Sequence, residues 1–135
     1  MCMEQRLRLQ GYVFPGGLTE KLHMFDGAPI ENLWLDVELP ITEAGVDQGL
    51  LQCDAYLGGT TGIYSGKWFF DGQGWSYRGY WAGRPLWDAD YNGVAVTQEG
   101  FVPYGGWTTC VIKQYRGTSN VGSVHQLDLD VTHAT

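Results

Sequence analysis

One segment rich in aromatic residues and glycine, residues 62–83, most constrains how this chain can fold. It holds eight of the chain's 19 aromatic residues and six of its 20 glycines. Two runs rich in strand-forming residues, 63–70 and 75–82, flank Asp71-Gly72-Gln73-Gly74. An Asp-Gly pair at such a junction supplies the positive φ that a tight hairpin turn needs. The segment therefore predicts a β-hairpin whose aromatic side chains stack across its two strands.

The remainder of the chain alternates apolar and polar side chains in short segments separated by turns. This period-two pattern is typical of half-buried strands. It predicts strands at residues 5–14, 18–25, 30–39, 50–57, 93–98, 107–115 and 124–132. Residues 42–46 have room for a helical turn, but Gly45 makes a longer helix improbable.

About ten residues per strand suits an antiparallel meander. We therefore predict an all-β fold in one domain, residues 1–135, with a single antiparallel meander closed into a β-barrel of about eight strands. Closure would remove both sheet edges, and the two terminal strands have the alternation needed to pair. A two-sheet β-sandwich has the same local signals and remains the alternative.

The aromatic segment also carries a repeated pattern. Residues 66–70 are GKWFF, residues 75–83 are WSYRGYWAG, and the later Gly100-Phe101 and Tyr104-Gly105-Gly106 continue the same texture. This resembles small eight-stranded barrels of the allene-oxide-cyclase and dirigent type, and avidin-like and lipocalin-like barrels share that architecture. The resemblance covers about half of the chain, residues 62–131. It implies a barrel wall built from such hairpins around a cavity, and it carries over no catalytic residue.

Charge and composition exclude several classes of partner. The net charge is −7, which repels phosphate backbones, so we expect no nucleic acid binding. The sequence has no basic cluster for an anionic membrane surface and no apolar run long enough to span a bilayer. The first ten residues lack the apolar stretch of a signal peptide, and the three cysteines are not closely spaced. These features predict free thiols and a cytoplasmic protein.

The excess of aromatic residues has two interpretations. The first is ordinary core and cross-strand packing. The second is an aromatic-lined barrel cavity that binds an amphipathic or aromatic small molecule without any cofactor. On the second hypothesis, the stacking residues are Trp68, Trp75, Tyr77, Trp81, Trp107 and Tyr56. Asp54, Arg78 and His125 would supply polar contacts. The leading prediction is a non-enzymatic small-molecule-binding protein.

The acidic residues support an alternative, an enzyme on the same barrel. Asp36 and Glu38 are two residues apart on one strand face, as are Asp128 and Asp130. Two such carboxylates can act as acid and base or bind a cation, although a solvated strand face has the same spacing. Glycoside hydrolysis needs one carboxyl in an apolar setting, and Asp36 beside Trp34 and Asp54 meet that condition.

An isomerase, cyclase or hydrolase would use one of these inward carboxylates or His125. The three histidines, His23, His125 and His133, show no metal-ligand spacing, so no metal site is predicted. A third hypothesis is a carbohydrate-binding or protein-interaction module with exposed aromatic residues. Such a surface could also form a homodimer through Trp34 or the loop around Trp87.

Overall fold

The computed structural model describes residues 9–90, 101–116 and 129–132 of the chain. They form one six-stranded sheet in the order β1-β2-β3-β4-β5-β6. Neighbouring strands pair in parallel from β1 to β5, and β6 pairs with β5 in the antiparallel direction. The strands are β1 (Leu9–Val13), β2 (Ile30–Asp36), β3 (Gly62–Ser65), β4 (Leu86–Ala89), β5 (Ile112–Arg116) and β6 (Leu129–Thr132).

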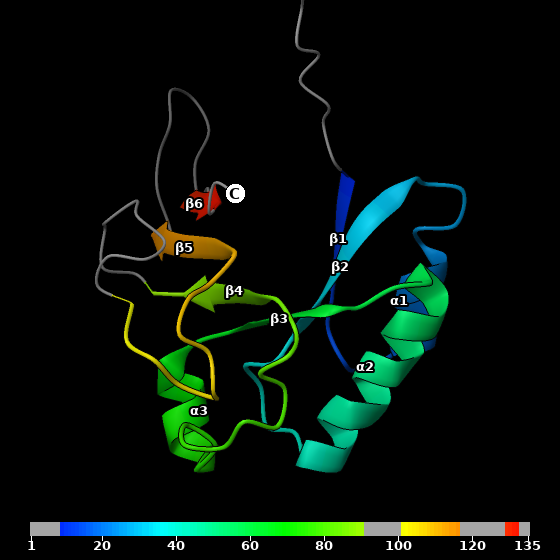
Figure 1. Ribbon diagram of the computed structural model, residues 1–135. Coiled ribbons are helices and arrows are strands. Elements are labelled where there is room, and N and C mark those ends of the chain that lie inside the picture. The colour runs from blue at the N-terminus through cyan, green and yellow to red at the C-terminus, as the bar shows by residue number, and fades with distance from the viewer. Residues whose placement is uncertain (1–8, 91–100, 117–128, 133–135) are drawn as a thin grey trace, which may run out of the picture.

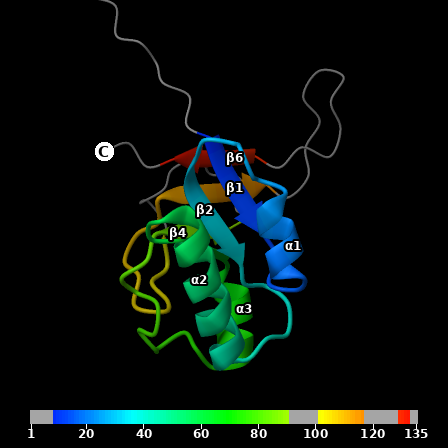
Figure 2. The same cartoon turned by 90° about the vertical axis from the view of Figure 1, so that its right-hand side faces the viewer.

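The three described helices are α1 (Leu18–His23), α2 (Glu43–Leu57) and α3 (Lys67–Gln73). Figure 1 shows the sheet curled and open, with the helices gathered on one side of it. In the view of Figure 2, α2 crosses in front of the sheet, with α1 beside it. No helix in the described part of the chain has the length and apolar character needed to cross a membrane.

A row of aliphatic side chains joins the sheet to these helices. Val13, Leu35, Ile63 and Leu86 occupy neighbouring positions across β1 to β4, and each is almost completely buried. They share one hydrophobic core with residues of α1 and α2, among them Leu18, Leu22, Val46, Leu50 and Cys53. Helix α2 approaches strand β2 closely at Gly49, where an added Cβ would lie 3.1 Å from Cδ2 of Leu35.

Local signals at both ends explain the longest helix, α2. The Thr42 side chain caps its first turn by accepting a 3.0 Å hydrogen bond from the Gly45 amide. At the other end, Gly58 has φ 70°, the left-handed conformation that commonly ends a helix. Between them, Val46, Leu50 and Cys53 recur at helical spacing and face the core.

These observations overturn the predicted all-β fold, both as a closed antiparallel barrel and as a sandwich. Helices α1 and α2 stand where strands were predicted at residues 18–25 and 50–57, since their apolar spacing satisfies a helical period as well as a period of two. Leu51, which a strand would place on the same face as the buried Cys53, is 66% exposed. Parallel strands also need long crossovers, and α1, α2 and α3 supply those from β1 to β4.

The predicted aromatic hairpin is wrong as well. Strand β3 leads directly into α3, and the Asp71-Gly72 pair lies inside that helix, not in a turn. The chain leaves α3 at Gly74, with φ 76°. Strand β4 lies in a segment predicted to be a loop. By contrast, the strand at 30–39 is confirmed as β2, and β1, β5 and β6 fall wholly or mostly within predicted strands. The predicted strand at 93–98 lies outside the described residues.

Candidate active site

The face of the sheet opposite the aliphatic row carries aromatic and polar side chains. Asp36, the last residue of β2, pairs in register with Tyr64 of β3, and Tyr64 pairs with Trp87 of β4. Tyr12 of β1 pairs with Trp34 of β2. Because side chains alternate along a strand, these five residues share one face of the curled sheet. They lie toward the carboxyl ends of the parallel strands, where α/β proteins commonly hold their ligands.

The rings on this face pack edge to face. The Tyr64 and Trp87 centroids are 5.3 Å apart, those of Tyr12 and Tyr64 are 5.4 Å apart, and those of Trp34 and Trp87 are 5.7 Å apart. Such contacts fix ring orientation as well as burying area. Gly62 allows the arrangement, since a Cβ there would lie 2.4 Å from the Trp34 ring. The rings thus form a rigid wall beside Asp36.

Hydrogen bonds orient the polar groups of this face. The Tyr12 hydroxyl donates to Oδ2 of Asp36, and the Tyr64 hydroxyl donates to Oε1 of Gln114 on β5. Trp34 Nε1 donates to Oε1 of Gln10 at 2.6 Å. The Asp36 side chain is buried, and its Oδ1 has no hydrogen-bond partner among the described residues. A buried polar atom without a partner is costly, so Oδ1 is a candidate to bind an ordered water.

The electrostatic setting keeps Asp36 protonated at neutral pH. Burial raises the pKa of its carboxyl to about 8, and the neighbouring Glu38 carboxyl adds to the rise. Glu38 follows the end of β2 and is half-buried, so it lies nearer to solvent than Asp36. A carboxyl that holds its proton at pH 7, next to a second and more accessible carboxyl, is an arrangement that can serve general acid catalysis.

The aromatic residues predicted to bind a ligand lie elsewhere. Trp75, Trp81 and Trp107 are buried on the helix side of the sheet, in the hydrophobic core. The Trp75 and Trp81 centroids are 5.2 Å apart, and Phe70 contacts all three of these tryptophans. Trp68 and Tyr77 are exposed, Tyr77 completely. The open sheet replaces the barrel cavity that these side chains were expected to line.

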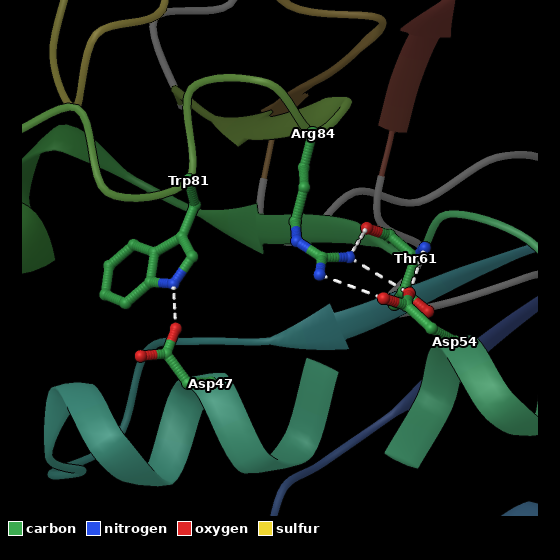
Figure 3. Close-up of polar contacts among 5 residues, drawn as sticks. All are labelled: Asp47, Asp54, Thr61, Trp81 and Arg84. Carbon is green, nitrogen blue, oxygen red and sulfur yellow. Dashed lines mark hydrogen bonds and ion pairs between the residues drawn. The ribbon is translucent and has the colours of Figure 1, made fainter. Parts of the chain in front are cut away.

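Of the polar residues predicted for the same site, Asp54 belongs to a network at the opposite end of the sheet (Figure 3). Both its carboxylate oxygens accept from Arg84, at 3.0 and 2.9 Å, and the Thr61 amide donates to Oδ1 at 2.7 Å. Burial opposes the charge on Asp54, but the bonds from Arg84 and Thr61 hold the pKa of its carboxyl below the usual value. Trp81 donates to Asp47 of α2 at 2.8 Å in the same view.

The other predicted residues are scattered. Tyr56 lies on α2 and donates to Asp26 at 2.7 Å, and Arg78 is exposed in the loop after α3. His125 and Asp128 lie outside the described residues, while Asp130 of β6 pairs in register with Gln114. Within the described ranges, no group of His, Cys, Asp and Glu side chains is arranged to hold a metal ion.

Sequence reasoning identified Asp36 and Glu38 as a candidate carboxylate pair, but it missed Tyr12, Tyr64 and Gln114. In the strand predicted at residues 5–14, Tyr12 shares a face with the polar residues Arg8 and Gln10 and so gives no signal of a site. The available signal was the near-continuous apolar run of residues 33–37, which is typical of a parallel strand buried on both faces. In such a sheet, the polar side chains on the face away from the helices are also packed against other residues and do not face solvent.

No protein-family model and no curated protein matches the sequence. Two solved structures share its fold. One is the spore cortex lytic enzyme SleM of Clostridium perfringens, with a TM-score of 0.69 and 16% identity over 90% of this chain and 48% of that one. The other is the catalytic domain of endolysin ply40 from bacteriophage P40 of Listeria monocytogenes, with a TM-score of 0.55 and 19% identity over 94% of this chain and 67% of that one.

These similarities replace the resemblance to allene-oxide-cyclase and dirigent barrels, which is wrong: those barrels are closed antiparallel meanders, and this sheet is open and parallel through β5. The repeated glycine-aromatic texture comes from a short strand, a short helix and a loop, so it marks no barrel wall. The chain spans about half the length of SleM. At these levels of identity, what is shared with the two lytic enzymes is the fold.

Proposed function

We propose that this chain is the catalytic part of a glycoside hydrolase that cuts a bacterial cell-wall polysaccharide, with Asp36 and Glu38 as its acidic pair. The observation that carries this proposal is the buried Asp36 at the carboxyl end of a central parallel strand, where burial raises the pKa of its carboxyl to about 8, with the accessible Glu38 two residues further on. The two proteins that share the fold, a spore cortex lytic enzyme and an endolysin catalytic domain, support the class of substrate.

The roles of the two carboxyls follow from their exposure. Asp36 is 1% exposed, so it is a poor candidate for direct contact with a bulky sugar, but it is well placed to hold a proton. Glu38 is half-buried and passes the proton to the oxygen of the glycosidic bond. The bond between that oxygen and the anomeric carbon then breaks. Water adds its hydroxyl to the anomeric carbon, and the remaining proton of that water returns to the carboxyl pair.

The surrounding residues position this pair. The Tyr12 hydroxyl fixes Oδ2 of Asp36, and the ring wall of Tyr12, Tyr64 and Trp87 limits the ways the carboxyl can turn. The same rings lower the local polarity, which is what keeps the proton on Asp36. The small-molecule-binding function predicted from the sequence has no support in this arrangement, whereas the hydrolase alternative does.

Product chemistry tests the proposal. Purified bacterial cell walls are incubated with the wild-type chain, Glu38→Gln and a control, Glu20→Gln, which changes an exposed carboxyl on α1. We expect new reducing sugar ends with the wild type and Glu20→Gln, and a loss of at least about 100-fold with Glu38→Gln. Release of new amino groups without reducing ends would show that the enzyme cuts peptide or amide bonds, and would refute the proposal.

A further inference from the structure

A second site lies on the same edge of the sheet, at the carboxyl end of β4. A pocket of about 230 Å³ opens there between α3, the last residues of β4 and the segment near Tyr104. Its lining includes Lys67, Trp68, Asp88, Asp90 and Tyr104. The ring wall and the Asp36 pair do not line it, so it is separate from the candidate active site.

Trp68 gives the pocket an accessible aromatic surface. It is 53% exposed, unlike Trp75, Trp81 and Trp107, which are buried in the core. Its position depends on Gly66, where a Cβ would lie 2.2 Å from Trp68 Nε1 and 3.0 Å from the Ala89 carbonyl oxygen. Because φ of Gly66 is −139°, this glycine is needed for space and not for backbone conformation. The chain thus leaves room for the indole at the end of β4.

Two carboxyls from β4 and its extension supply polar contacts. Asp88 is buried, and its Oδ1 accepts a 2.7 Å hydrogen bond from the Tyr104 hydroxyl. Asp90 is more exposed, and its Oδ2 lies 3.9 Å from Nζ of the buried Lys113. The Asp90 backbone is held to β5, since its amide donates to the Gln114 carbonyl oxygen at 3.0 Å. These contacts fix the carboxyls in place.

Most of the charges around the pocket are paired, and the three carboxyls of Asp71, Asp88 and Asp90 outnumber the two lysines by one. Lys113 offsets Asp90, and Lys67 is already bound to Asp71 at 2.7 Å. The pocket would therefore repel an anion, and a neutral ligand with hydroxyl donors fits its carboxyls. A sugar ring has what such a pocket can hold: an apolar face to lie on an indole, and hydroxyls to donate to carboxylates.

The distance between the pocket and Asp36 follows from the order of the strands. Strand β3 lies between β2 and β4, so the strands that carry the two sites are two spacings, about 10 Å, apart. Asp88 follows Leu86 by two residues and so faces the helix side, which means that a polysaccharide chain bound at both sites would pass over the carboxyl edge of the sheet. We propose that the pocket formed by Trp68, Asp88 and Asp90 is a saccharide subsite that holds a ring of the polysaccharide beyond the bond being cut. This assignment rests on the proposed function for its choice of substrate, but it can be tested by binding alone.

The test uses the full chain carrying Glu38→Gln, so that no turnover occurs, and a tetrasaccharide of N-acetylglucosamine as the probe. Calorimetric titration compares this parent with versions that also carry Trp68→Ala, Gly66→Ala or Tyr77→Ala. We expect Trp68→Ala and Gly66→Ala to weaken binding about fivefold, as an aromatic contact of this kind contributes on the order of 1 kcal/mol. Tyr77→Ala removes a completely exposed ring outside the pocket and should leave the affinity unchanged.

The outcomes separate this subsite from the proposed function. Trp68-dependent binding by a wild-type chain that releases no reducing ends would keep the subsite and refute the hydrolase. Release of reducing ends, with Trp68→Ala and its parent binding equally well, would overturn the subsite alone. Failure of the parent to bind the tetrasaccharide would also overturn it. Thermal unfolding of each variant confirms that a loss of affinity is not a loss of fold.

Discussion

The two faces of the curled sheet differ in chemistry although the same strands build both. Toward the helices, Val13, Leu35, Ile63 and Leu86 form a continuous aliphatic row. Toward the other side, Tyr12, Tyr64 and Trp87 pack against one another on the face that carries the buried carboxyl of Asp36. The aliphatic face contributes stability through burial, whereas the aromatic face holds a costly polar group. Buried polar groups of this kind are found most often at functional sites.

The substitution Asp36→Asn tests most sharply whether the aromatic face serves catalysis and the aliphatic face serves stability. Asparagine is nearly isosteric with the protonated acid, so at about pH 4 and below, where the carboxyl is protonated in the folded and the unfolded chain, the free energy of unfolding should change little. The rate of reducing-end release should fall at least about 100-fold, since the carboxyl that supplies the proton to Glu38 is gone. Chemical denaturation and the cell-wall assay measure the two quantities on the same preparation. An active Asp36→Asn variant would place the catalytic group elsewhere.

Leu35→Ala tests the helix-covered face. Leu35 is completely buried against α2, so the substitution should lower the free energy of unfolding by about 3 kcal/mol. Leu51→Ala is the matched control, because Leu51 lies on α2 but is 66% exposed, and its cost should stay within about 0.5 kcal/mol. At a temperature where both variants are folded, Leu35→Ala should retain its catalytic rate. Equal costs for the two leucines would mean that the aliphatic row is not the core.

Arg84→Ala tests the network that joins α2 to the starts of β3 and β4. Removing the guanidinium leaves Asp54, whose side chain is 26% exposed, without its bidentate partner, and should cost about 2 kcal/mol. Lys67→Ala removes a more exposed ion pair with Asp71 and should cost no more than about 0.5 kcal/mol. Denaturant midpoints measured side by side would reveal the difference. A larger cost at Lys67 would contradict this ranking.

The pH dependence of stability gives the smallest expected effect when it is counted per pH unit. The folded-state pKa of Asp36 lies above its unfolded value, so the native state binds more protons between pH 4 and pH 8. This contribution to stability is fully present below the unfolded pKa and is lost as pH rises toward 8, by at most about 1.4 kcal/mol per pH unit. Asp36→Asn should therefore gain stability relative to the wild type over that range. A constant difference would show that Asp36 has an ordinary pKa.

How far the sequence predicts this molecule depends on whether local pattern and tertiary pairing agree. Residues 30–39 have a clear strand pattern, and the strand is there as β2, with Asp36 and Glu38 at its end. The apolar spacing of residues 50–57 fits both the strand period of two and the helical period. The helix forms because Thr42 caps its start, Gly58 ends it in a left-handed conformation and Cys53 packs on the sheet. Pairing direction was not available from local alternation, so the strands were assigned to a meander.

The site was harder to predict than its acidic pair. Asp36 and Glu38 could be named from spacing alone, but the partners of Asp36 come from strands far apart in the sequence. Tyr12 is 24 residues away from Asp36, and Tyr64 and Gln114 are 50 residues apart. Only the parallel register brings these side chains to one face. The aromatic excess, taken as evidence for a pocket, is largely a packed core around Phe70.

The most direct test of the account is the titration of the Asp36 carboxyl itself. Carbon-13 NMR of protein labelled at aspartate, recorded from pH 3 to pH 9 for the wild type and Asp36→Asn, isolates the signal that the substitution removes. We expect that signal to titrate with a pKa of about 8. If the wild-type signal that is absent from Asp36→Asn titrates near the ordinary aspartate value of about 4, Asp36 is charged at neutral pH and cannot hold the catalytic proton.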